Sequence, residues 1–390
     1  MYKKSILISL ATVLLLGLMV NHAGAIPAFA RKYKVSCSTC HIAIPKLKAY
    51  GDEVAANGFH LPDGEEPKRA YIDTGDDLLM LNSDFPIAVR FDAFAQVADR
   101  ENAKTDFGVP FGIKLLSGGT VSRKVSYYFY FYLSEAGDVA GVEDAYLYFN
   151  NIGGVPFNLT VGQFQVCDPL FKRELRLTYE DYEIFRVSPG LSQANLTYDR
   201  GLILDYGFDF GLTATGMVLN GNGIKPAEND IFDSDNNKSF VLRLKQEIGP
   251  VGIGVFGYTG KETLSDSASV KNKILDIGPD LTIVTENWEL ALEYLHREDD
   301  NARFLTSNPV KTKTDGGFAE LTVLPESDRS RFIYTLLYNY VNSNMDELDY
   351  QTGTLSISYM AARNLRMLAE GTYDMKNKKS RFTLGIVSAF

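Results

Sequence analysis

The chain has 390 residues, a formal net charge of −10 and only three cysteines. The acidic balance argues against nucleic acid as a partner, because its phosphates select a basic protein surface, and three cysteines are too few for the disulfide framework of an exported protein of this size. The 22 tyrosines and 24 phenylalanines, with a mean hydropathy of only −0.10, favour a sheet whose two faces meet different solvents.

Residues 1–25 have the three parts of a secretory signal peptide. Lys3 and Lys4 form a basic head, residues 6–20 are apolar, and residues 23–25 read A-G-A, a small-residue cleavage site. Cleavage there would take the net charge to −12, because both lysines leave. An uncleaved membrane anchor is the alternative, since the apolar run is long. No later stretch approaches the ~20 apolar residues that a spanning helix needs.

Residues 37–41 read C-S-T-C-H, the attachment signature of a c-type haem. The two-residue spacer lets Cys37 and Cys40 reach the vinyl groups on one edge of the porphyrin, and His41 would bind the iron as the proximal ligand. A zinc site would need four ligands, and no second cysteine pair exists. A thiol–disulfide redox pair would need a thioredoxin-like βαβ setting, which is absent. The motif therefore predicts one covalently bound haem c.

The sixth ligand of the iron is left open between two residues. His60, in N-G-F-H-L-P, can fold back over the ring, and Met80, in D-D-L-L-M-L-N, is the other nearby candidate. Methionine would raise the reduction potential relative to a second histidine. The choice therefore affects function as well as structure.

Residues 42–59 suggest a helix beside the haem motif. Pro45 suits its first turn, and Gly58 is a natural stop at its C-terminal end. One face would carry Leu47, Tyr50 and Val54. Gly51 interrupts the helix at a cost of about 1 kcal/mol against alanine. Either the glycine is merely tolerated, or it permits the close approach of a flat ligand.

From residue 84 onward the hydrophobic pattern has a period of two. The stretches 87–97, 125–135 and 288–298 alternate in this way, as in V-S-Y-Y-F-Y-F-Y-L-S-E. Segments of this kind recur to the end of the chain and match the ~9–11 residues of a tilted strand that crosses a bilayer. The terminal segment S-R-F-T-L-G-I-V-S-A-F ends on Phe390, an aromatic residue like that of the terminal strand in bacterial outer-membrane proteins.

Short and long connections separate these segments. Short ones lie near Gly153, Gly249 and Ala362, whereas long polar ones cover 220–239 and 296–317. Outer-membrane barrels have short periplasmic turns and long external loops. We therefore predict a mostly-β chain with a transmembrane barrel of about sixteen strands. A soluble β-sandwich is the alternative, but it rarely keeps even strand spacing for this length.

The segment 168–186 breaks the strand pattern and mixes charged with aromatic residues. It would either fold into the lumen as a constriction or form an ordinary external loop. Cys167, just before it, has no sequence neighbour with which to pair and is expected only to pack. The predicted organisation is a signal peptide at 1–25, a small α-helical monohaem cytochrome c-like domain at 26–75 and a porin-like barrel at 76–390.

The opening of the mature chain resembles the fused monohaem cytochrome c–porins of bacterial outer membranes, whose best-known members are iron oxidases. The matching residues are Pro27, Phe29, Ala30, Arg31, Cys37, Cys40, His41, Pro45, Leu47, Gly51, Asn57 and Gly58. The close match covers some thirty-five residues; the remainder agrees in architecture. The resemblance implies a haem domain within or beneath a sixteen-stranded pore, on the periplasmic side of the outer membrane.

The resulting functional hypothesis is an electron conduit in contact with outer-membrane lipid. An extracellular donor such as Fe(II) would reduce the haem, and a periplasmic c-type cytochrome would accept the electron, which would make the protein an Fe(II):cytochrome c oxidoreductase. Two alternatives remain: a diffusion porin whose haem segment is only a plug, and a conduit that moves electrons outward.

Overall fold

The computed structural model describes residues 28–61, 71–72, 74–76, 81–82, 86–100, 104–122, 124–263 and 270–390. The predicted signal peptide and Met80 therefore lie outside the described residues, as does most of the stretch 62–86 before the first long strand.

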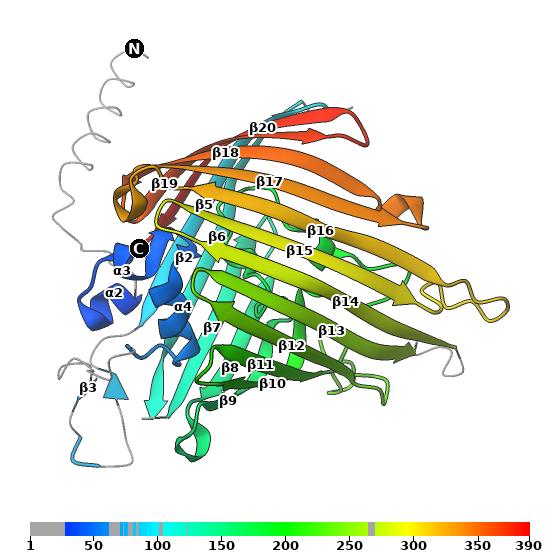
Figure 1. Cartoon of the computed structure of the whole chain (residues 1–390), viewed down its shortest axis with the longest axis horizontal. Helices are drawn as coiled ribbons and strands as arrows, with labels where there is room; N and C mark the ends of the chain where they lie inside the picture. Colours follow the sequence, from blue (N-terminus) through cyan, green and yellow to red (C-terminus); the bar gives the residue numbers. More distant parts are fainter. Residues whose placement is uncertain are drawn as a thin grey trace, which may run out of the picture.

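Sixteen antiparallel strands form one closed barrel, which confirms the predicted barrel and its strand number (Figure 1). They are β5 (Ile87–Ala98), β6 (Thr105–Ser122), β7 (Val125–Glu135), β8 (Gly141–Phe149), β9 (Phe157–Gln165), β10 (Tyr198–Gly207), β11 (Leu212–Leu219), β12 (Ser239–Ile248), β13 (Val251–Thr263), β14 (Lys271–Val284), β15 (Trp288–Asp299), β16 (Thr312–Val323), β17 (Phe332–Ser343), β18 (Tyr350–Ala362), β19 (Leu365–Asp374) and β20 (Lys379–Ala389). Each strand pairs with its sequence neighbours, and β20 closes the barrel on β5, with Leu384 opposite Ala95.

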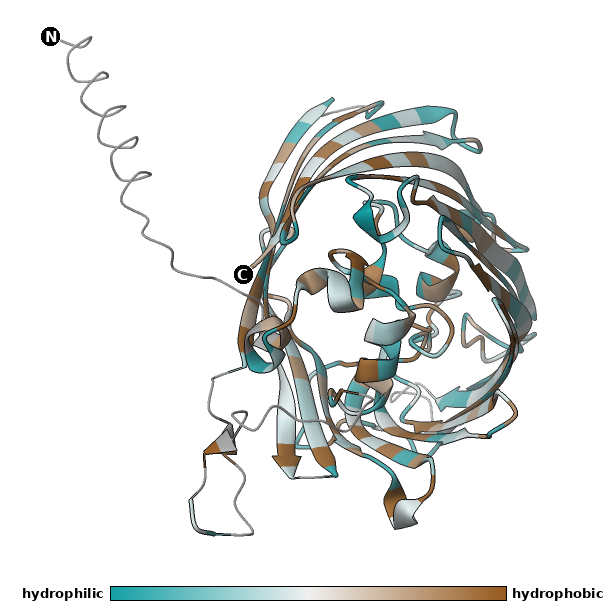
Figure 2. Ribbon diagram, turned by 60° about the vertical axis from the view of Figure 1, so that its left-hand side comes forward, coloured by the Kyte–Doolittle hydropathy of each residue, from teal (hydrophilic) through white to brown (hydrophobic). Residues whose placement is uncertain are grey.

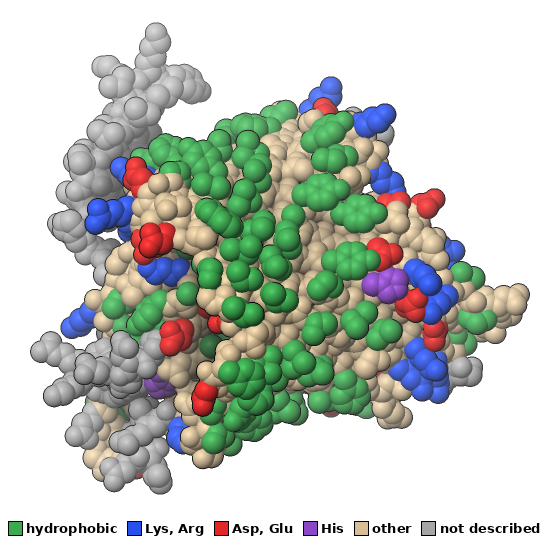
Figure 3. Space-filling view, in the orientation of Figure 1, with side chains coloured by type: hydrophobic (Ala, Val, Ile, Leu, Met, Phe, Trp, Pro, Cys, Tyr) green, Lys and Arg blue, Asp and Glu red, His purple; other side chains and the backbone are tan. Residues whose placement is uncertain are grey.

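The alternating pattern places apolar side chains on the outside of the barrel. Along β17 every second residue, beginning with Phe332, is exposed, and the residues between them are buried. Figure 3 shows hydrophobic side chains over the middle of the wall and charged ones toward its two ends. Closure leaves no unpaired strand edge, which a hydrocarbon environment requires. No helix in the described part of the chain is long and apolar enough to cross a membrane.

Because the strands are antiparallel, their connections alternate between the two ends of the barrel. One end carries short turns, such as the two residues between β12 and β13, and we call it the short-turn end. The other carries the long connections, among them residues 166–197 and 220–238, and we call it the long-loop end. The predicted alternation of short and long connections is therefore present.

Residues 28–61, which we call the N-terminal unit, lie at the short-turn end beside the C-terminus (Figure 1). The unit contains α2 (Ala28–Tyr33), α3 (Cys37–Cys40), β1 (His41–Ala43), β2 (Lys46–Leu47) and α4 (Ala49–Ala56). A separate pair of short strands, β3 (Tyr71–Ile72) and β4 (Leu81–Asn82), follows it. In Figure 2, turned by 60° from Figure 1, short helical segments are seen inside the ring of barrel strands.

The prediction of a helix starting near Pro45 was wrong. Pro45 lies in the tight turn between β1 and β2, and α4 begins only at Ala49. Leu47, expected on the helical face, is instead paired with His41 in the small sheet. The expected stop is present, because Gly58 has a φ of +64° just after α4 and its N–H bonds the carbonyl of Ala55.

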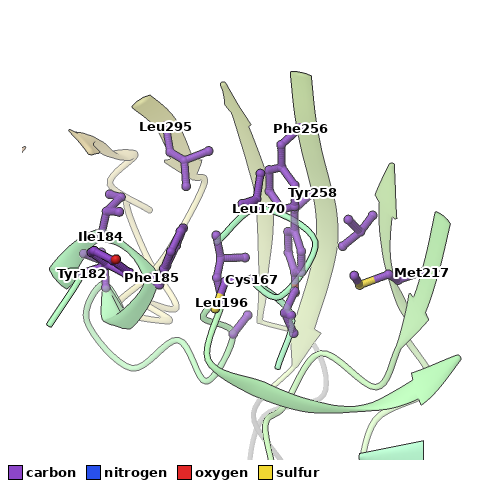
Figure 4. Close-up of a cluster of buried hydrophobic side chains, with 14 of the residues drawn as sticks. Cys167, Leu170, Tyr182, Ile184, Phe185, Leu196, Met217, Phe256, Tyr258 and Leu295 are labelled. Atoms are coloured by element: carbon purple, nitrogen blue, oxygen red, sulfur yellow. The ribbon is translucent and has the colours of Figure 1, made fainter. Parts of the chain in front are cut away.

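Residues 166–197, which we call the inner loop, fold into the lumen from the long-loop end. The loop includes two short 3-10 helices, η2 (Arg173–Leu175) and η3 (Glu183–Arg186). Its apolar side chains pack against lumen-facing residues of β11 to β17, such as Phe256 and Leu295 (Figure 4). Cys167 lies in this cluster with 0% of its surface exposed. Of the two placements considered from the sequence, the lumen is therefore the correct one.

Candidate haem-binding site

Cys37 and Cys40 occupy the two ends of the one-turn helix α3, so both thiols leave the helix on the same face. Ser36 caps this helix, and its hydroxyl accepts a hydrogen bond from the Ser38 backbone N–H at 3.3 Å. Both thiols are free and half-buried. Burial raises the pKa of each thiol, so both are protonated at neutral pH. The two thiols thus form no disulfide, and the helix holds them at a fixed separation.

His41 follows α3 directly, and the tight turn at Pro45 orients its ring. Its Nδ1 lies 3.0 Å from the Pro45 carbonyl oxygen. A carbonyl can only accept, so Nδ1 carries the proton and Nε2 keeps the lone pair that binds a metal. Burial lowers the pKa of His41, and the backbone contacts oppose this effect only in part. The imidazole is therefore neutral, which is the state that ligates iron.

These residues fit a c-type haem by the chemistry of their donor atoms. Two free thiols one helical turn apart suit two thioether bonds on one edge of a porphyrin, and the imidazole next to them is neutral and held in one tautomer. Cys37, Cys40 and His41 are therefore the residues that would hold the group, in the roles expected from the sequence.

Gly51 is required by a close contact inside the protein. A Cβ at this position would lie 2.2 Å from the carbonyl oxygen of Cys40 and 3.0 Å from Cδ2 of Leu47. The glycine therefore lets α4 pack directly on the haem-motif helix α3. Neither of the two explanations weighed from the sequence, simple tolerance or approach of a flat ligand, included this contact.

Replacing Gly51 by alanine is expected to push α4 away from α3. Forcing a methyl group into this contact should destabilise the N-terminal unit by about 1–3 kcal/mol or more. Hydrogen–deuterium exchange over residues 37–56 should then become about tenfold faster or more, because exchange reports local opening. Gly371→Ala is the matched control, since an added methyl there meets no atom within 4 Å. Unchanged protection in Gly51→Ala would contradict the proposed role of the contact.

One side of the N-terminal unit is anchored to β15 and β16 by ion pairs. The Nζ of Lys46 lies 3.0 Å from carboxylate oxygens of both Glu289 and Glu320. Burial lowers the pKa of Lys46, but the two carboxylates more than offset it and hold the pKa above its ordinary value. Nearer the rim, Lys48 pairs with Asp328 at 2.7 Å. The lysines of β2 and its flank thus fasten the unit to this wall.

The opposite side is anchored to β7, β8 and the turn that follows β8. The Ser126 hydroxyl donates to the Gly58 carbonyl at 2.5 Å, and the Tyr148 hydroxyl donates to the Ala56 carbonyl. Asn150 donates to the Asn57 side chain at 2.8 Å. The unit therefore spans the lumen between two walls at the short-turn end.

Apolar contacts also hold the N-terminal unit against the barrel wall. Ala43 packs with Leu324, Ile333 and Met360, and Ile44 packs with Phe94, Leu368 and Val387. Phe59 stacks between Phe29 and Tyr128, with ring centroids 5.1 and 5.4 Å away. The inner loop reaches the unit from the other end, where Lys172 pairs with Asp52 at 2.7 Å. The haem-motif residues therefore lie between the short-turn mouth and the inner loop.

The two candidates for the sixth ligand have different outcomes. His60 lies two residues beyond Gly58, half-buried, and its backbone N–H bonds the Asn57 carbonyl at 3.4 Å. It belongs to the same unit as His41, but its role at the iron stays a prediction. Met80 lies outside the described residues.

A scan against protein-family models and a search of the curated proteins gave no match. Solved structures do resemble the chain. OmpT of Vibrio cholerae, expressed in the outer membrane, is 12% identical, with a TM-score of 0.55 over 80% of this chain and 99% of that one. An anion-selective porin from Comamonas acidovorans is 10% identical, with a TM-score of 0.55 over 78% and 98%.

OmpF of Salmonella typhi, solved in a complex with daunomycin, is 11% identical, with a TM-score of 0.55 over 82% of this chain and all of that one. At such low identity these likenesses concern the fold alone. The chain therefore has the closed sixteen-stranded fold of outer-membrane porins.

Proposed function

We propose that the protein is an electron conduit of the bacterial outer membrane. It takes an electron from an extracellular donor, Fe(II) being our first choice, onto a haem c held by Cys37, Cys40 and His41, and a periplasmic c-type cytochrome accepts that electron. The observation that carries the proposal is the position of the C-x-x-C-H motif, braced to opposite walls in the short-turn mouth of a porin-type barrel.

The proposed location rests on three independent features. The barrel carries an apolar outer belt, its fold is that of outer-membrane porins, and the chain begins with a signal-like segment. In barrels of this type the short turns face the periplasm. The haem motif would then be accessible to a periplasmic partner, and the long-loop end would face the external medium.

A bound haem would supply reversible one-electron exchange between Fe(III) and Fe(II). The chain's own residues have three tasks in this arrangement. Cys37 and Cys40 would fix the group covalently, and His41, held by Pro45, would present Nε2 in a fixed orientation. The anchors at Lys46 and Asn150 would keep the N-terminal unit at one depth in the barrel. A fixed position matters because electron-transfer rates fall steeply with distance.

A diffusion porin with a haem-bearing plug is the second candidate, and the likeness to channel-forming barrels favours it. Against it stands the presence inside the barrel of two segments, the N-terminal unit from one end and the inner loop from the other. Outward electron flow would use the same geometry. It would differ only in the relative potentials of the two partners.

Anoxic stopped-flow absorbance tests the conduit directly. Ferric holoprotein in detergent, mixed with Fe(II) near neutral pH, should develop the bands of reduced haem rapidly. Reduction by dithionite is the control that shows that the haem can be reduced. If dithionite reduces the haem and Fe(II) does not, iron is not the donor. If no extracellular donor works but a reduced periplasmic cytochrome does, the flow is outward.

A further inference from the structure

Three carboxylates lie near the point where the inner loop leaves the barrel wall. Glu143 and Asp144 are neighbours on β8, and Asp168 lies in the inner loop shortly after β9, the strand paired with β8. The β7–β8 ladder is irregular between Tyr130 and Phe131, and Glu143 is the residue without a partner. Such a bulge redirects a side chain. Glu143 accepts a hydrogen bond from Tyr198 at 2.6 Å, while Asp144 is only 6% exposed.

These three carboxylates lack the counter-charges that their neighbours have. Within the described residues none of them forms an ion pair, and one oxygen of Asp144 and one of Asp168 are buried without a hydrogen-bond partner. Glu174, by contrast, pairs with Lys114 at 2.8 Å, and Asp52 pairs with Lys172 at 2.7 Å.

Burying unpaired carboxylates side by side is unfavourable unless a proton or a cation neutralises them. The buried oxygens of Asp144 and Asp168 that lack a hydrogen-bond partner therefore call for such neutralisation.

The carboxylates lie next to the haem-motif residues. Asp52 follows Gly51, whose Cα packs on Cys40, and the charge of Asp52 acts on both His41 and Asp168. Tyr146, two residues beyond Asp144, packs at a tilt against Tyr128 with ring centroids 5.5 Å apart, and Tyr128 stacks in turn on Phe59 of the N-terminal unit. A charge bound by Asp144 and Asp168 would thus lie close to a group held by His41.

A polar cavity lies at the long-loop end. It has a volume of about 750 Å³ and is lined by residues 188–198 of the inner loop and its end and by residues 222–225. Tyr198 belongs to its lining and donates the hydrogen bond to Glu143. A small hydrated ion in the cavity would therefore be one side chain away from Glu143.

We propose that Asp144 and Asp168, with Glu143 beside them, bind a partly hydrated divalent cation next to the haem-motif helix. The described residues contain no ready-made group of three or more His, Cys, Asp or Glu ligands that would enclose a metal ion. The cation therefore keeps part of its water, as hard divalent ions bound by one or two carboxylates do. Loose binding suits an ion that arrives and leaves. That this ion is the electron donor rests on the proposed function, whereas its binding does not.

Mn(II) is a suitable probe, because it is a hard divalent cation whose free form has a strong electron paramagnetic resonance signal that is lost on binding. Titration of detergent-purified holoprotein should reveal one saturable site per chain. Asp144→Asn combined with Asp168→Asn should weaken it about tenfold or more, since both charges are removed. Asp168→Asn alone should weaken it too, and it leaves every barrel strand intact. Glu247→Gln, which removes an acid paired with Lys245 at a short turn, should change nothing.

Thermal unfolding gives a second readout. Mn(II) should raise the Tm of the wild type above its value in chelator, and it should not do so in the double variant. If the wild type binds no more Mn(II) than the double variant does, a shared proton neutralises the pair and the proposal is wrong. Fe(II) stopped-flow absorbance separates the two proposals. If the protein binds Mn(II) but Fe(II) does not reduce the haem, iron is not the donor. If Fe(II) reduces the haem at equal rates in the wild type and the double variant and neither binds Mn(II), only the cation site is wrong.

Discussion

Replacing Cys37 and Cys40 together by alanine should abolish covalent haem attachment and leave the barrel folded. The two thiols project from one helical turn and are the only described cysteines near His41, since Cys167 is buried in the lumen cluster. Expression in a host that matures c-type cytochromes, followed by denaturing electrophoresis with haem staining, measures attachment. The wild type should retain about one haem per chain and the variant none.

Two matched variants sharpen this experiment. Cys167→Ala removes a thiol that packs among apolar residues, so it should leave haem attachment unchanged. His41→Ala keeps both thioether bonds but removes the proximal nitrogen, so the haem should stay attached with the absorption spectrum of an altered iron ligation. Haem staining of the double cysteine variant would refute the assignment of Cys37 and Cys40 as the attachment residues. A wild type that carries no haem after maturation would refute it too. Heat-modifiable electrophoretic mobility checks that each barrel has folded.

Replacing Lys46 by glutamate should release the N-terminal unit from the barrel. The change places a third carboxylate against Glu289 and Glu320, each 3.0 Å from the present ammonium, and Glu320 is almost fully buried. Breaking a buried pair in this way costs about 3–5 kcal/mol. The unit should then be cleaved by added protease, and planar-bilayer conductance should rise from a nearly closed wild type to a partly open channel, because the inner loop remains in place.

Lys48→Glu is the control for this second variant, since Lys48 pairs with the exposed Asp328 near the rim. Such a pair contributes about 1 kcal/mol or less, so protease resistance and conductance should hardly change. Lys46→Glu combined with Glu320→Lys restores one opposite-charge pair and should restore part of the protection. Wild-type conductance in Lys46→Glu would show that the contacts of Asn150 and Ser126 suffice to hold the unit.

The same two variants separate the candidate functions. A diffusion porin requires an open path through the intact holoprotein, whereas a conduit works with a filled lumen. The described structure has the inner loop packed on the wall and the N-terminal unit seated across the mouth. A closed wild type that opens on Lys46→Glu would agree with the conduit, and a steadily open wild type would favour the porin.

The sequence by itself determined the features that depend on residues close together in the chain, namely the strands, their lipid-facing sides and the haem-attachment motif. Period-two alternation predicts which side of β7 or β15 faces lipid, because successive side chains of a strand point to opposite sides. Repetition of that pattern, with short and long connections in turn, was enough to predict the strand number. The C-x-x-C-H motif is likewise local, since one helical turn brings its donors together. The helix start at Pro45 failed because pairing of His41 with Leu47 outweighed the local preference of proline.

Only the tertiary structure decided which distant residues share the lumen. Lys46 meets Glu320 across 274 positions, and no local pattern marks either of them as a partner. The inner loop could have lain outside the barrel; it lies inside because its apolar side chains find the lumen-facing side chains of β11 to β17. That Asp144 and Asp168 both have a buried oxygen without a partner can be seen only in the folded barrel, where β9, which precedes Asp168, pairs with β8, which carries Asp144. Such contacts depend on barrel closure, which brings together residues that are far apart in sequence.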